Sequence, residues 1–138
     1  SLKKRVNFLE ETFALLKLEN ITAIHGRAEE FAKNKAYREQ YDLCVSRAVS
    51  NLATLSEYCL PYVKVGGNFI SYKSGTVQEE LQQAEKAVKI LGGKIQDVVY
   101  FNLPDSEIQR SLVVIEKMKS TPGRYPRKAG TPLKEPLS

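Results

Sequence analysis

Apolar and polar positions along the chain alternate in a pattern typical of an α/β protein. Short runs rich in β-branched residues, 21–25 and 42–46, are separated by stretches with helical spacing. Runs of this length and composition are typical of strands buried on both faces, as in a parallel sheet. A helix is predicted over about 2–18 and a short helix from about Ala28. The apolar stripe of the first helix recurs at spacings of four and three: Leu2, Val6, Leu9, Phe13 and Leu16.

The second half of the chain continues this alternation and then changes to two adjacent strands. Helical spacing predicts helices over 52–60 and 77–91, with a strand between them that follows a Gly66-Gly67 turn. The last two apolar runs, 95–103 and 111–115, are separated by too few residues for a crossover helix, so they predict an antiparallel hairpin. Alternating β and α units that end in such a hairpin are typical of a class I methyltransferase sheet, a Rossmann-like α/β fold.

The excess positive charge of the chain lies in its C-terminal tail. Six of the 21 Lys and Arg residues, but one of the 16 acidic residues, follow residue 116, which leaves fifteen of each sign before it. We therefore expect two regions, a folded part over 1–119 and a basic tail over 120–138. The tail is rich in Pro and Gly and is expected to be extended and unpacked. Its charge favours a polyanion partner, nucleic acid before membrane, with a solubilising role as the alternative.

Charged residues follow the predicted strands at the edge where open α/β sheets bind ligands. Glu29 comes just after the run 21–25, and Arg47 comes just after the run 42–46. We expect both to face one crevice, although Glu29 in a first helical turn would also complement a helix dipole. Arg110 precedes the last strand and is able to pair with phosphate or with guanine O6, or it is an exposed hairpin residue.

Residues that would indicate other chemistry are few. Cys44 and Cys59 fit no metal spacing and are predicted to be reduced core thiols of a cytoplasmic protein. His25 stands at a strand end without a recognisable nucleophile and is expected to be structural. We predict no bound metal, and no apolar run is long enough to span a membrane.

Several motifs, taken in order, resemble the glucose-inhibited division protein B family. Enzymes of this family use S-adenosylmethionine to methylate N7 of a guanine in bacterial small-subunit (16S) ribosomal RNA. The matching segments span nearly the whole chain: Ser1-Leu2-x-Lys4-Arg5-x-x-Phe8-Leu9, Arg27-Ala28-Glu29-Glu30, Ser46-Arg47-Ala48, Arg110-Ser111-Leu112-Val113-Val114-Ile115 and Tyr125-Pro126-Arg127-Lys128-Ala129-Gly130-Thr131-Pro132.

The resemblance implies S-adenosyl-L-methionine as cofactor and 16S rRNA, or the small-subunit ribonucleoprotein, as partner. It implies cofactor contacts from Ala28, Glu29 and Arg47. Guanine N7 is already nucleophilic, so no catalytic base is expected, and the protein has to orient the reactants. Expected RNA contacts are Arg110, Arg124, Arg127 and Lys128, with Tyr72 and Lys73 as further residues on the RNA side.

Part of the family pattern is absent from this sequence. The Gly-rich loop and the acid that follows the second strand are not found, so the chain is expected to supply strands three to seven of the order 3-2-1-4-5-7-6. The first two strands are expected to be missing, and the chain alone is expected to be inactive. The alternatives are a class I methyltransferase with another substrate and an α/β RNA-binding module without catalytic activity.

Overall fold

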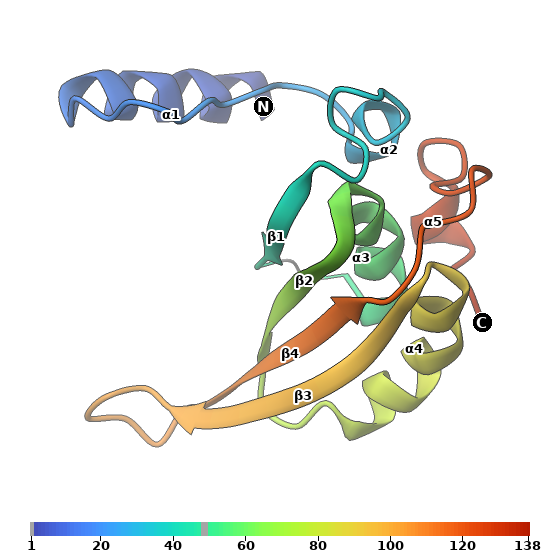
Figure 1. Ribbon diagram of the computed structural model, residues 1–138. Helices are drawn as coiled ribbons and strands as arrows, with labels where there is room; N and C mark the ends of the chain where they lie inside the picture. Colours follow the sequence, from blue (N-terminus) through green and yellow to red (C-terminus); the bar gives the residue numbers. More distant parts are fainter. Residues whose placement is uncertain (1, 48–49) are drawn as a thin grey trace.

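The structure, a computed structural model, describes residues 2–47 and 50–138 (Figure 1). Ser1 of the first family motif and Ala48 of the Ser-Arg-Ala motif lie outside the described residues.

A four-stranded mixed sheet forms the centre of the described chain. Its order is β1-β2-β4-β3, with β1 and β2 parallel and β4 antiparallel to both of its neighbours. This confirms the predicted hairpin, and it is the 4-5-7-6 half of the expected strand order. The strands are β1 (Tyr41–Ser46), β2 (Val63–Ser74), β3 (Gly93–Asn102) and β4 (Gln109–Lys117).

Gly66 and Gly67 form a bulge inside β2 and not a turn ahead of it. The pairing with β1 shifts between Tyr41↔Val63 and Leu43↔Asn68, so β2 has extra residues there. Gly66 has φ +91°, which favours glycine, and a Cβ on Gly67 would lie 2.6 Å from the carbonyl oxygen of Asp42. The glycines therefore allow the strand to begin earlier than predicted.

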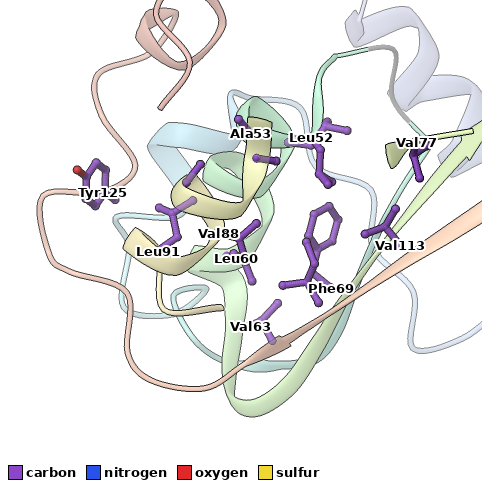
Figure 2. Packing of buried hydrophobic residues seen from close by; sticks show 14 residues of the cluster. Leu52, Ala53, Leu60, Val63, Phe69, Val77, Val88, Leu91, Val113 and Tyr125 are labelled. Atoms are coloured by element: carbon purple, nitrogen blue, oxygen red, sulfur yellow. The ribbon is translucent and has the colours of Figure 1, made fainter. Parts of the chain in front are cut away.

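Two helices cover one face of the sheet and enclose the core. They are α3 (Leu52–Cys59), which continues into the 3-10 turn η1 (Leu60–Tyr62), and α4 (Gln78–Ile90). Phe69 from β2 and Val113 from β4 point into this core (Figure 2). The helical spacing predicted over 77–91 is confirmed by α4, because the apolar residues at that spacing are buried or half-buried against the core: Val77, Leu81, Ala84, Val88 and Leu91.

The opposite face of the sheet and the N-terminal segment are solvent-exposed. Leu43 and Val45 of β1 are 52% and 53% exposed. The first helix, α1 (Leu2–Leu15), ends earlier than the predicted residue 18 and buries none of its residues. Figure 1 shows it to one side of the sheet. Its apolar stripe is therefore correctly patterned but contacts no core in the described chain.

The predicted strand over 21–25 is wrong for this structure. These residues have no regular secondary structure, and Ile21 and Ile24 are about half exposed. A strand needs a hydrogen-bonding neighbour, and none of the described strands pairs with this segment. The direct pairing with β1 that would have contradicted the expected strand order is also not found among the described residues.

The tail is packed, contrary to the expectation of an extended, unpacked segment. Tyr125 is 7% exposed, Pro132 is buried, and a short helix, α5 (Thr131–Lys134), lies beside α3 (Figure 1). The hydroxyl of Thr54 in α3 donates a hydrogen bond to the carbonyl oxygen of Pro132 at 3.0 Å. Composition predicts solvation for such a tail, but buried polar partners on α3 hold it.

Candidate ligand site at the carboxyl ends of the strands

A hollow of about 1000 Å³ lies where β1 and β2 end, beside the turn of the β3–β4 hairpin. Arg47 follows the last residue of β1, and Arg110 lies at the start of β4. The sheet therefore brings together two of the arginines that sequence reasoning selected. The hollow is lined by Arg47, Ser50, Asn51, Tyr72, Lys73, Ser74, Glu80, Phe101, Leu103, Arg110, Ser111 and Leu112.

An ion pair on the helix side of the hollow neutralises one of its cations. Lys73 Nζ lies 2.7 Å from Glu80 Oε1 and donates to the carbonyl oxygen of Ser50 at 2.8 Å. The same Glu80 oxygen accepts a hydrogen bond from the backbone amide of Leu52 at 2.7 Å, which satisfies a free amide at the start of α3. Glu80 thus ties Lys73 of β2 and its own helix α4 to the start of α3.

The charges of Arg47 and Arg110 are not neutralised by other described side chains and are available to a ligand. Arg47 is exposed and Arg110 is half-buried, and neither forms an ion pair with another described residue. Ser111 adds a buried hydroxyl that has no hydrogen-bond partner in the described part of the chain. The hollow is therefore cationic, with a hydroxyl free to donate or accept.

Two exposed aromatic residues also line the hollow. Tyr72 is 44% exposed and Phe101 is 39% exposed. Sequence reasoning selected Tyr72 but missed Phe101 and Glu80. Phe101 lies in an ordinary strand pattern, which gives no functional signal. The sequence position of Glu80 predicts only an acid that complements the dipole of α4.

Glu29 and Arg47 do not face one crevice in this structure. The helix α2 (Ala28–Phe31) lies at the amino ends of β1 and β2 (Figure 1), where the carbonyl oxygen of Ala28 accepts a hydrogen bond from the Tyr62 hydroxyl at 2.5 Å. The Glu29 side chain is buried and accepts from the amide of Gly130 at 3.1 Å. Because the segment before α2 is not paired in the sheet, nothing holds α2 at the carboxyl edge.

The basic residues of the tail differ in availability. Arg127 is bound to Glu57, which is fully buried, by contacts of 2.8 Å from Nη2 and 3.0 Å from Nε, and its Nη2 also donates to the carbonyl oxygen of Glu135. Arg124 lies over the Tyr125 ring at 5.1 Å, and Lys128 is exposed. The Nε and Nη2 groups of Arg127 are therefore occupied by contacts within the fold.

Arg38 fastens the other end of the tail, and sequence reasoning missed it. Its guanidinium donates to the carbonyl oxygens of Ala32, Thr121, Pro122 and Tyr125 at 2.8–3.2 Å. Three of these acceptors lie more than eighty residues from Arg38, so they leave no local signal in the sequence.

The two cysteines are free thiols, as predicted. They lie together between β1 and α3, where a hydrogen bond with Cys44, together with burial, raises the pKa of the Cys59 thiol. Among the described residues there is no cluster of His, Cys, Asp and Glu able to hold a metal ion. No described helix is both long and apolar enough to cross a membrane.

The fold defines the class of protein. The order β1-β2-β4-β3 with its antiparallel hairpin, and two helices on one face, is the half-sheet of a class I S-adenosylmethionine-dependent methyltransferase. The structure of M. jannaschii TYW2 in complex with AdoMet is similar, with a TM-score of 0.56 at 13% identity. That match covers 82% of this chain and 53% of that one.

The chain belongs to the GidB family, rRNA small subunit methyltransferase G, whose family model matches residues 1–113. Proteins named ribosomal RNA small subunit methyltransferase G from Lachnoclostridium phytofermentans and Clostridium tetani are 56% and 51% identical to it over 137 residues. These matches cover 99% of this chain. The chain spans 57% of the length of these two relatives.

Proposed function

We propose that this chain forms part of an enzyme that transfers a methyl group from S-adenosyl-L-methionine to N7 of a guanine in 16S rRNA. The observation that carries the proposal is the cationic hollow at the carboxyl ends of a class I methyltransferase half-sheet, in a chain of the GidB family. Binding in that position is the general rule for open α/β sheets.

The residues of the hollow fit one side of a cofactor site. The exposed guanidinium of Arg47 suits the carboxylate of S-adenosylmethionine, because it forms no ion pair with any described residue. The cofactor, when bound, supplies an activated methyl group. The protein has to orient guanine N7 in line with that methyl group and to exclude competing water.

The fit of Ala28 and Glu29 to the cofactor is proposed from the family resemblance. In this structure Glu29 is bonded to the tail, so a cofactor contact requires α2 to lie at the other edge of the sheet. Glu29→Ala should then weaken cofactor binding by about 1–3 kcal/mol, the range for a lost charged hydrogen bond. If cofactor affinity is unchanged while the tail becomes more mobile, the role of Glu29 is structural.

The proposed partners and cellular location follow from the proposed methylation of 16S rRNA. The cations Arg110, Arg124 and Lys128 are proposed to contact 16S rRNA or the small-subunit particle. We propose a cytoplasmic location, in keeping with the free thiols of Cys44 and Cys59.

The test uses the extended protein, meaning this chain within a full-length protein of the family. It is incubated with radiolabelled S-adenosylmethionine and with 16S rRNA or small subunits. Label should appear in the RNA, and borohydride reduction followed by aniline should cleave the RNA strand at the modified guanine. Label that appears only in small molecules would favour another methyltransferase substrate. Tight RNA binding without any cofactor binding would favour a non-catalytic RNA-binding module.

A further inference from the structure

The register of the hairpin places two aromatic rings and one guanidinium on the same face of the sheet. Tyr72 of β2 pairs with Leu112 of β4, and Phe101 of β3 pairs with Arg110 of β4. Residues directly opposite each other share a face, and so do residues two apart along a strand. Tyr72, Arg110 and Phe101 therefore lie on one face, at the edge of the hollow that all three line.

The spacing of the two rings leaves room for one base on each. Tyr72 and Phe101 belong to β2 and β3, which are separated by β4, and they pair with β4 residues two positions apart, Leu112 and Arg110. Their backbones therefore lie two strand spacings apart across the sheet and two residues apart along it, roughly 12 Å in all. Arg110 stands on the strand between them. A guanidinium between two rings suits the phosphate that joins two stacked nucleotides.

The exposure and charge of this surface favour a single-stranded nucleic acid. Tyr72 and Phe101 are 44% and 39% exposed. Lys73 is neutralised by Glu80, whereas Arg47 and Arg110 form no ion pair within the described chain. Aromatic rings on a sheet, beside unpaired cations, are the recurring surface that binds unstacked RNA bases and their phosphates. The bases of a duplex are covered on both faces and would not fit.

We propose that Tyr72 and Phe101 each stack on one base of a single-stranded RNA segment, while Arg110 pairs with the phosphate between these bases. The inference rests on the proposed RNA substrate. It specifies which residues bind the RNA and that the RNA they recognise is single-stranded. Tyr100 provides a matched comparison. Tyr100 is 41% exposed, similar in size to the proposed stacking residues and adjacent to Phe101. It pairs with Ser111 of β4, so it lies on the opposite face of the sheet from Phe101, and it does not line the hollow.

The experiment measures the binding of the extended protein to a short single-stranded RNA that carries 2-aminopurine, at fixed salt. Stacking on a ring should quench the fluorescence. Tyr72→Leu and Phe101→Leu should each weaken binding about 5- to 150-fold, the effect of losing one stacked base, and should reduce the quenching. Tyr100→Leu should change neither the affinity nor the quenching. Tyr72→Phe, which keeps the aromatic ring that Tyr72→Leu removes, should retain most of the binding.

Several outcomes would overturn the proposal. These are unchanged binding in both leucine variants, an equal loss in Tyr100→Leu, or a duplex that binds as tightly as the single strand. Methyl transfer is measured separately on the same variants. Stacking that follows the expected pattern without methyl transfer would defeat the proposed function and leave this inference standing. RNA methylation with an unchanged KM for RNA in both leucine variants would defeat this inference and leave the proposed function standing.

Discussion

Removal of the Arg127 side chain should destabilise the fold by about 2–3 kcal/mol. Glu57 is fully buried and accepts four hydrogen bonds, three from the guanidinium and one from the backbone amide of Arg127 at 2.8 Å. Breaking a fully buried ion pair costs about 3–5 kcal/mol, because one charge stays buried without its partner. The loss should be smaller here, since the amide remains in Arg127→Ala and the arginine side chain is 25% exposed.

The measurement is urea unfolding of the extended protein, followed by circular dichroism. Lys128→Ala is the matched control, because this neighbouring basic residue is exposed, and it should change the free energy of unfolding by less than about 0.5 kcal/mol. In a Glu57→Gln background, Arg127→Ala should cost much less, since no buried charge is left. Similar effects of Arg127→Ala and Lys128→Ala on stability, with a lower salt dependence of RNA binding in the Arg127 variant, would show that Arg127 is an RNA contact.

Three further outcomes are expected in the extended protein. Arg47→Ala should weaken cofactor binding by about 1–3 kcal/mol in a calorimetric titration, whereas Glu30→Ala should have little effect, and equal losses would contradict the assignment. Replacing both Arg124 and Lys128 by Gln should flatten the slope of log RNA affinity against log salt by about 1.5–2 units, and an unchanged slope would leave these residues without an RNA role. Burial, with nearby groups that become anionic, raises the pKa of Tyr62 from 10 to about 12. The stability that Tyr62 contributes should therefore be complete below pH 10 and lost between pH 10 and 12, and Tyr62→Phe should remove this loss in unfolding measured against pH.

Local patterns predicted well those elements that contact their neighbours along the chain. The helix over 77–91 and the hairpin that follows it are confirmed, because their apolar periodicity and turn residues act over short distances. The motifs around Arg47 and Arg110 pointed to the edge of the sheet where the hollow lies, since residues that follow or precede strands have a known place in an α/β fold.

Only the tertiary structure decided where the remaining charges act. Arg127 and Lys128 are adjacent and chemically alike, yet Arg127 pairs with Glu57, seventy residues earlier, while Lys128 is exposed. Glu29 bonds to Gly130, about a hundred residues away. The same dependence on distant partners explains the segment 21–25, whose β-branched residues favour a strand that has no pairing neighbour among the described strands. Composition and periodicity specify what a segment is able to form, whereas burial, pairing and charge neutralisation depend on the groups that the fold brings beside it.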